Sequence, residues 1–256
     1  MHYSVCIPAV LGKKEPSAAL NAVKAANFEQ YEIWSWWDKD IAAYQKAQQE
    51  NHLTIAALCT SFIPLTDPAR RQDYVNGLRS TIEVCRKLGC KTVISQVGQE
   101  LDDRSREEQH ESIAAGLREC VPLLKDADIT LVIETLNTKI DHRGYYLWSS
   151  EEAFRIIDEV GDPHVKVLFD LYHQYIMNDL DIGHIVKNID KIGHFHMAGY
   201  PGRHEPMIDS EIDYPKILKA ISETGYQGSV GLEYFPVHDA EEGLKLLHEQ
   251  LNMIFR

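Results

Sequence analysis

The sequence predicts a single α/β domain over residues 1–256 that folds as a (β/α)8 barrel, the TIM barrel. Three observations support this prediction. Short apolar runs rich in β-branched residues alternate eight times with longer amphipathic stretches. The short runs are apolar on both faces, as expected of parallel strands covered by helices. A chain of 256 residues also has the usual length of one such barrel.

The elements follow one another in strict alternation. Strands are predicted at residues 2–7, 31–34, 53–58, 91–96, 130–134, 165–170, 191–196 and 229–234. Helices are predicted at residues 16–28, 38–51, 68–88, 104–127, 149–160, in a region from 171 to 187, and at 214–225 and 239–255. A doubly wound open sheet is the alternative, but that fold does not need an eighth strand–helix unit. No glycine-rich fingerprint follows the first strand, so neither dinucleotide binding nor a P-loop is indicated.

Composition narrows the class of partner. The net charge of −13 disfavours binding to nucleic acid, whose affinity comes largely from lysine and arginine. No apolar stretch approaches about 18 residues, so we expect no membrane partner. The five cysteines lack metal-binding spacing and no signal peptide is evident, which predicts a reduced, cytoplasmic protein. A small-molecule substrate and a homo-oligomeric state are the remaining expectations for partners.

Four consecutive predicted strands end in a residue that can bind a divalent cation. These residues are Glu134, Asp170, His196 and Glu233. Barrel enzymes carry their active sites at the carboxyl ends of the strands, so the four side chains are predicted to meet. A purely structural interpretation stays open for each one: Asp170 could cap the following helix, and either glutamate could pair with an arginine.

Three carboxylates and one imidazole form a hard, anionic ligand set. Such a set suits Mn²⁺, Mg²⁺ or Co²⁺, and Zn²⁺ is also compatible with it. A cation of this kind can hold two neighbouring oxygens of a hydroxy-carbonyl compound and polarise its carbonyl. Glu134 and Glu233 could then face the substrate from opposite sides, one removing a proton from carbon and the other returning one. The residues therefore predict proton transfer through an enediol.

Four segments carry a resemblance to a known family. They read IETLNT at 133–138, LFDLYHQYIM at 168–177, IGHFHMAGYPGRHEP at 192–206 and VGLEYFP at 230–236. Together they resemble the hydroxypyruvate isomerase family, which belongs to the xylose isomerase-like TIM barrels. The similarity runs from the second predicted strand to the eighth and is tightest in the second half of the chain.

The resemblance implies roles for individual residues. Glu134, Asp170, His196 and Glu233 fall on the family's metal-site positions, and Glu134 and Glu233 also fall on its paired catalytic acids. His173 matches a residue that contacts substrate oxygens in related ketose 3-epimerases, and Arg203 matches a substrate-binding arginine. The implied activity is a metal-dependent, aldose–ketose type isomerisation of a small sugar or hydroxy-keto acid.

Two departures from the family pattern keep a second activity open. Hydroxypyruvate isomerases commonly carry glutamine at the position of His196, where ketose 3-epimerases carry histidine. The 3-epimerases carry a second glutamate at the position of Ile140. A ketose 3-epimerase is therefore the alternative, and a barrel that binds a small molecule without catalysis is a third hypothesis. An abasic-site endonuclease shares this fold, but the acidic charge disfavours it.

Other polar and aromatic residues near the predicted strand ends are harder to assign. Trp36 is predicted to line the substrate pocket, whereas Trp34 is expected to pack in the core. Glu32 lies two positions before Trp34 and could face inward in a functional role, but a single glutamate does not define a site. His194 shares a strand face with His196, and we interpret it as a packed, hydrogen-bonded histidine.

Overall fold

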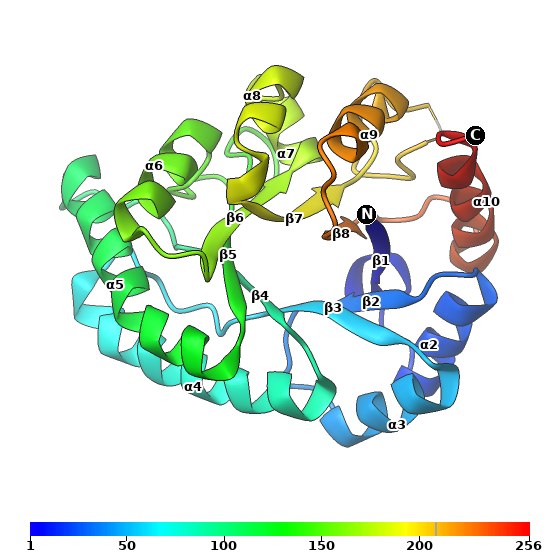
Figure 1. Cartoon of the computed structure of the whole chain (residues 1–256), viewed down its shortest axis with the longest axis horizontal. Helices are drawn as coiled ribbons and strands as arrows, with labels where there is room; N and C mark the ends of the chain where they lie inside the picture. Colours follow the sequence, from blue (N-terminus) through cyan, green and yellow to red (C-terminus); the bar gives the residue numbers. More distant parts are fainter. Residues whose placement is uncertain (208) are drawn as a thin grey trace.

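The computed structural model describes residues 1–207 and 209–256, and over these residues the chain forms one closed barrel of eight parallel strands. Neighbouring strands follow chain order from β1 to β8, and β8 pairs back onto β1. Figure 1 shows the strands at the centre of the molecule and the helices arranged around them. The predicted (β/α)8 fold is confirmed.

The barrel strands are β1 (His2–Cys6), β2 (Gln30–Ile33), β3 (Thr54–Cys59), β4 (Thr92–Ser95), β5 (Thr130–Glu134), β6 (Val165–Asp170), β7 (Ile192–Met197) and β8 (Ser229–Leu232). The helices are α1 (Ile7–Val10), α2 (Pro16–Ala25), α3 (Ile41–Asn51), α4 (Arg71–Leu88), α5 (Arg106–Ala127), α6 (Ser150–Val160), α7 (Leu171–Met177), α8 (Ile182–Lys187), α9 (Tyr214–Glu223) and α10 (Ala240–Met253). Short 3-10 turns occupy Pro68–Arg70 and Ile189–Lys191.

Two features of the helical layer differ from the prediction. The region after β6 is two helices rather than one, because Asn178 adopts a left-handed conformation with φ of 60° and ends α7. Asp181 then caps the start of α8 by accepting a hydrogen bond from the backbone of His184. The four-residue α1 was not predicted, since so short a helix leaves no periodic pattern.

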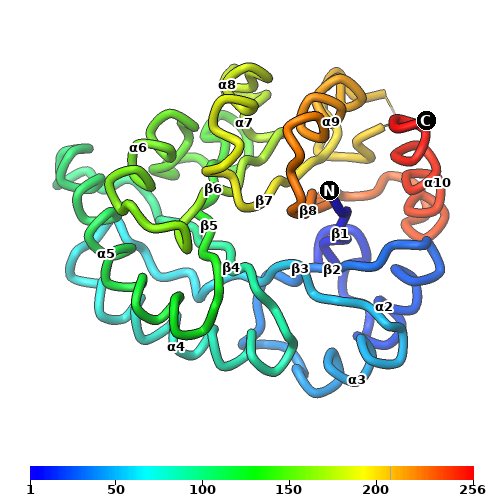
Figure 2. The backbone as a smooth tube through the Cα atoms, in the orientation of Figure 1, coloured from blue at the N-terminus to red at the C-terminus, as the bar shows by residue number. Residues whose placement is uncertain are grey.

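The closure of the sheet excludes the open, doubly wound alternative. His2 to Val5 of β1 pair in parallel with Ser229 to Leu232 of β8, so neither strand forms an exposed edge. In the outer layer α10 packs beside α2, which brings the last helix of the chain next to the first long one (Figure 2). The barrel is therefore continuous in both layers.

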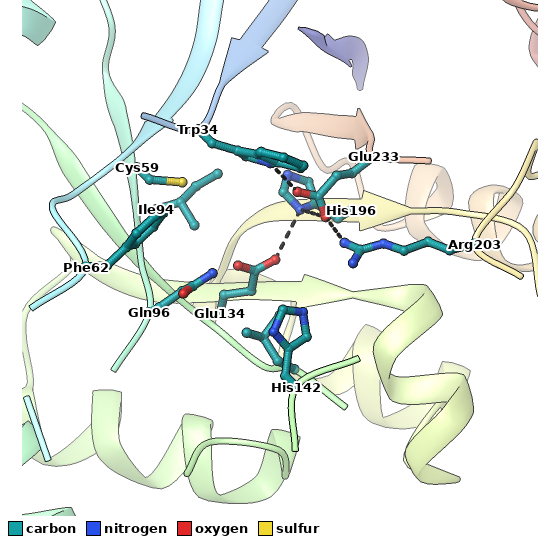
Figure 3. A pocket seen from close by; sticks show the side chains of 11 residues that line it. Trp34, Cys59, Phe62, Ile94, Gln96, Glu134, His142, His196, Arg203 and Glu233 are labelled. Atoms are coloured by element: carbon teal, nitrogen blue, oxygen red, sulfur yellow. Dashed lines mark hydrogen bonds and ion pairs between the residues drawn. The ribbon is translucent and has the colours of Figure 1, made fainter. Parts of the chain in front are cut away.

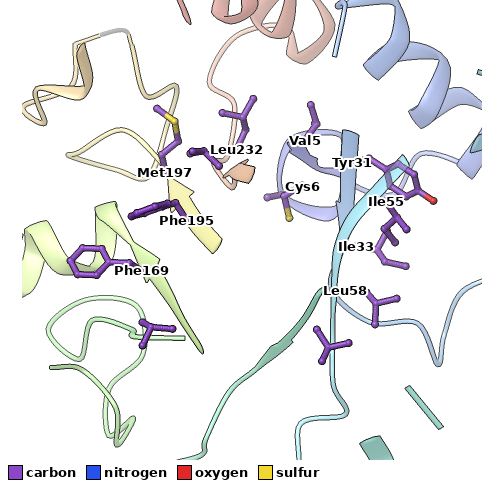
Figure 4. Packing of buried hydrophobic residues seen from close by; sticks show 14 of the residues in the cluster. Val5, Cys6, Tyr31, Ile33, Ile55, Leu58, Phe169, Phe195, Met197 and Leu232 are labelled. Atoms are coloured by element: carbon purple, nitrogen blue, oxygen red, sulfur yellow. The ribbon is translucent and has the colours of Figure 1, made fainter. Parts of the chain in front are cut away.

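Side chains alternate between the two faces of each strand. The main apolar core lies between strands and helices, and Figure 4 shows members of it that include Tyr31, Ile33, Phe169, Phe195 and Met197. A smaller apolar cluster of buried strand residues consists of Ala57, Cys59, Ile94, Val132 and Leu168. Because Leu168 and Asp170 share a face, as do His194 and His196, these polar side chains point to the barrel interior rather than to the helices.

Two further properties concern the whole chain. The five cysteines, Cys6, Cys59, Cys85, Cys90 and Cys120, are buried free thiols. Within the described ranges, no helix combines the length and the apolar character that crossing a bilayer requires.

The N-terminus of α5 provides a test of local helix stability. Ser105 accepts a hydrogen bond from the backbone N–H of Glu108, and the Glu108 carboxylate accepts one from the backbone N–H of Ser105. We expect Ser105→Ala to lower the free energy of unfolding by about 1 kcal/mol, because it leaves a helix N–H without its partner. Chemical denaturation measures this change.

Ser80→Ala is the matched control for that variant. Ser80 is exposed within α4, where alanine is the better helix former, so its replacement should leave stability unchanged or slightly raised. Equal losses in the two variants would contradict the role of Ser105 as a cap.

Candidate active site

The four residues predicted from the strand ends lie together in the structure. Glu134 and Asp170 are the last residues of β5 and β6, His196 lies near the end of β7, and Glu233 directly follows β8. One potential ligand atom from each lies within 4.8 Å of the others, and all four residues are buried. Figure 3 shows Glu134, His196 and Glu233 facing one another across the mouth of the barrel.

The Nδ1 atom of His196 faces the three carboxylates. It lies 3.2 Å from Glu134 Oε1, 3.5 Å from Glu233 Oε2 and 3.9 Å from Asp170 Oδ2. Burial alone would lower the pKa of the imidazole, but the charges of Glu233 and Glu32 raise it well above its ordinary value. A positive charge among these carboxylates is therefore strongly favoured.

The other ring nitrogen of His196 contacts a second group of residues deeper in the structure. Its Nε2 lies 2.9 Å from Glu32 Oε2, and Nε2 of His194 lies 2.9 Å from Glu32 Oε1. The hydroxyl of Ser4 donates a hydrogen bond to the same Oε1. Burial raises the pKa of Glu32, but the two histidines outweigh it and hold the pKa at about 2. The structure thus confirms that His194 is a packed, hydrogen-bonded histidine.

Both oxygens of Glu233 accept hydrogen bonds from fixed donors. Trp34 Nε1 donates to Oε1 at 2.6 Å, and Arg203 Nη2 donates to Oε2. The Arg203 guanidinium lies 5.6 Å from the ring centres of both Tyr172 and Phe235, which hold it in place. Burial raises the pKa of Glu233, but Arg203 and His196 lower it below its ordinary value overall. Glu233 is therefore held ionised.

Asp170 has a double contact at the start of α7. Its Oδ1 accepts a hydrogen bond of 2.8 Å from the backbone N–H of His173, so Asp170 caps the helix, as one sequence interpretation proposed. Its Oδ2 remains directed at the cluster. Burial raises the pKa of Asp170 to about 7, although His196 and Arg203 oppose the rise.

His173 is fully buried next to this cluster. Its Nδ1 lies 2.6 Å from Asn137 Nδ2, and its Nε2 lies 3.7 Å from Asp170 Oδ2 without a hydrogen bond. Burial lowers the pKa of His173 well below its ordinary value, so the imidazole is neutral. The ring of His142 covers it edge-on, at 5.1 Å between ring centres.

A cavity of about 200 Å³ opens beside the cluster. It is lined by Trp34, Cys59, Phe62, Ile94, Gln96, Glu134, Leu136, His142, His196, Arg203 and Glu233 (Figure 3). The apolar wall faces the acidic groups across this space. Asp170 and His173 lie behind the lining, and their buried side chains are not among the described residues that line the cavity.

The two tryptophans differ in their contact with the cavity. Trp34, expected in the core, packs against both apolar clusters and also lines the cavity, where it donates to Glu233. Trp36, expected in the pocket, lies outside the described lining and packs edge-on against Trp37, at 5.7 Å between ring centres. The strand β2 ends at Ile33, so the alternation that would carry Trp36 to the same face as Trp34 stops before it.

Sequence reasoning assigned no role to two residues that line the cavity, one from a neighbouring strand end and one from a loop. Gln96 directly follows β4, and His142 lies in the long loop after β5 with a buried Nε2 that has no hydrogen-bond partner among the described residues. Glu32 was noted but not assigned. Its alternation with Trp34 was the available signal, and the pairing partners on β7 could not be read from it.

The cluster fits a hard divalent cation. Glu134, Asp170, His196 and Glu233 supply carboxylate oxygens and an imidazole nitrogen at mutual distances that one ion could span. Burial is the main cause of the raised pKa of Asp170, and the charges of Glu233 and Glu134 add to it. On the other side of the imidazole, Glu32 Oε2 lies 2.9 Å from Nε2 of His196.

Comparison with known proteins agrees with this arrangement. Residues 20–250 match the model of the family described as xylose isomerase-like TIM barrel. Hydroxypyruvate isomerase of Escherichia coli is 34% identical over 178 residues, which cover 70% of this chain and 68% of that protein. The 2-oxo-tetronate isomerase of Cupriavidus necator is 29% identical over 184 residues, covering 72% and 70% of the two chains.

A solved structure shares the whole fold. The protein described as AP endonuclease, family 2, from Brucella melitensis superimposes with a TM-score of 0.91 at 24% identity, covering 97% of this chain and 99% of that one. At this identity the likeness concerns the fold alone. The family match and the named isomerases among the sequence relatives are the findings that bear on activity. The chain is an isomerase and belongs to the xylose isomerase-like TIM barrel family.

Proposed function

We propose that the chain is a divalent-cation-dependent isomerase that interconverts a small aldose and ketose, or a hydroxy-keto acid such as hydroxypyruvate, by enediol proton transfer between Glu134 and Glu233. One observation carries the proposal. Three carboxylates and the Nδ1 of His196 converge at the mouth of a xylose isomerase-like barrel, next to a cavity large enough for a small molecule. The sequence relatives named for hydroxypyruvate and 2-oxo-tetronate support a keto-acid substrate.

The cation would be held by Glu134, Asp170, His196 and Glu233. Mn²⁺, Mg²⁺ or Co²⁺ suits this set best, and Zn²⁺ is also compatible with it. When bound, such an ion polarises the substrate carbonyl and stabilises the negative charge of the enediolate.

Glu134 and Glu233 differ in how they are held, and this difference suits two proton-transfer roles. Glu233 accepts from Trp34 and Arg203 and is kept ionised, so it starts the reaction as an anion. Glu134 lines the cavity and is contacted by His196 Nδ1 at 3.2 Å. One carboxylate, acting as a base, removes the carbon-bound proton, and the other, in its acid form, returns a proton to the neighbouring carbon. The hydroxyl proton passes to the former carbonyl oxygen, so that carbonyl and hydroxyl exchange places.

Arg203 and His173 are proposed to bind the substrate. Arg203 lines the cavity, and its buried Nε has no hydrogen-bond partner within residues 1–207 and 209–256, so it can donate to a substrate carboxylate or hydroxyl. The buried Nε2 of His173 is likewise without a hydrogen-bond partner in the part of the chain that the structure describes. The role predicted for Trp36 has less support, because Trp34 occupies the cavity wall.

A ketose 3-epimerase acting on a free sugar is the second candidate. The observation in its favour is His196, a histidine at the position where the hydroxypyruvate isomerase pattern has glutamine. Product analysis distinguishes the two activities, because an epimerase returns a ketose and an isomerase exchanges the positions of carbonyl and hydroxyl.

Removal of the cation should abolish turnover. We expect chelated, metal-free protein to lose isomerisation of hydroxypyruvate by at least 100-fold, because the enediolate charge then lacks its main stabilisation. Adding Mn²⁺, Mg²⁺ or Co²⁺ should restore the rate. A coupled turnover assay measures both, with metal content checked by elemental analysis. Full activity in protein shown to be metal-free would refute cation dependence.

Glu134→Gln should block the proton transfer. At saturating cation we expect kcat to fall by about 10²–10⁴-fold, and the incorporation of solvent deuterium into product to fall with it. Mass spectrometry of product formed in D₂O follows this exchange. Glu152→Gln is the matched control, since Glu152 contacts Tyr146 and Arg106 between the outer helices. Unchanged turnover in the Glu134 variant would remove this residue from the mechanism.

Arg203→Gln should distinguish acidic from neutral substrates. If the guanidinium binds a carboxylate, KM for hydroxypyruvate should rise by tenfold or more, and KM for a neutral ketose of similar size should rise much less. Steady-state kinetics on the two substrates give the comparison. Equal effects on both would mean that Arg203 acts through Glu233, to which it donates a hydrogen bond, and not through a substrate carboxylate.

A further inference from the structure

The buried group formed by Ser4, Glu32 and His194 lies on the far side of His196 from the proposed cation. We propose that Glu32 is a positioning residue, which holds His196 with its proton on Nε2 so that the lone pair of Nδ1 faces the cation. This inference rests on the proposed cation-binding role of His196. It assigns a function to a carboxylate from β2, which the proposed mechanism does not otherwise use.

The first support is the division of contacts between the two ring nitrogens. Nε2 of His196 contacts Glu32 Oε2 at 2.9 Å, whereas Nδ1 faces Glu134, Asp170 and Glu233. A neutral imidazole donates from one nitrogen and accepts at the other. When a cation takes the place of the proton on Nδ1, the ring is neutral, and the hydrogen bond from Nε2–H to Glu32 keeps the Nδ1 lone pair on the side where the cation would be bound.

The second support is that Glu32 is itself held in place. Its Oε1 accepts from Ser4 Oγ and from His194 Nε2, which leaves Oε2 for His196. β2 and β7 are not neighbours in the barrel, so these contacts cross the interior and fix the rotamer from both sides. Because the Glu32 oxygens already accept three hydrogen bonds, support of His196 explains this group better than a second metal site does.

The third support is the close packing beside this group. Gly231 of β8 pairs with His196, and a Cβ atom added at Gly231 would lie 2.5 Å from Glu32 Oε1 and 2.5 Å from His196 Cδ2. The absence of a side chain at 231 gives the carboxylate and the imidazole the room to meet. The pair is thus fixed by packing as well as by hydrogen bonding.

Glu32→Gln tests this role, since it keeps the shape of the side chain and removes its charge. We expect the Kd of Mn²⁺, measured by calorimetry on metal-free protein, to rise by 10–100-fold. Glu152→Gln, the same exchange in the outer layer, should leave the Kd within twofold of wild type and controls for general destabilisation. A Kd within twofold of wild type in Glu32→Gln, in a folded variant, would overturn the proposal.

A measurement on the unmodified protein keeps the proposal falsifiable even if the variant fails to fold. With ¹⁵N-labelled histidine and Zn²⁺ as a diamagnetic probe, long-range ¹H–¹⁵N spectra should show His196 bound through Nδ1 and protonated at Nε2. Binding through Nε2, or a proton on Nδ1, would overturn it. A wild-type protein that binds neither Mn²⁺ nor Zn²⁺ overturns the proposed function as well, whereas normal wild-type binding with an unaffected Glu32→Gln variant overturns only this inference.

Discussion

Negative charge concentrated inside the barrel is the constraint on which the whole site depends. Glu32, Glu134, Asp170 and Glu233 are each at most 6% exposed, and burying an unpaired carboxylate is costly. The imidazole of His196 lies between these carboxylates, with Glu32 on one side and the other three on the opposite side. The cost of burial is not offset equally for each carboxylate. The pKa values of Glu32 and Glu233 are lowered, whereas burial raises the pKa of Asp170 to about 7.

The fold was predictable because its signals are local and repeated. Each strand is a short apolar run, each helix has an apolar face, and eight repeats in a chain of this length leave the closed barrel as the consistent solution. The prediction failed where local signals are weak. The end of α7 depends on the left-handed conformation of Asn178, and α1 is a single turn.

The convergence of Glu134, Asp170, His196 and Glu233 was predictable for a different reason. The closed barrel places its strands side by side in chain order, so residues at the ends of successive strands become neighbours in space. The same logic cannot find Glu32 as the partner of His196, because that contact crosses the interior between strands that are not adjacent. Nor could it choose between Trp34 and Trp36, because β2 ends before both and the pairing register of β2 with β3 shifts within it, between Tyr31 and Glu32.

The hydrogen bonds on the outer oxygens of the cluster limit how each carboxylate can act as a ligand. Asp170 Oδ1 is committed to the N-terminus of α7, and Glu233 Oε1 to the indole of Trp34. In each carboxylate it is the second oxygen, Asp170 Oδ2 or Glu233 Oε2, that is turned toward His196 Nδ1. Glu134, His196 and Glu233 also line the cavity, so an incoming molecule with two adjacent oxygens could reach an ion held between them.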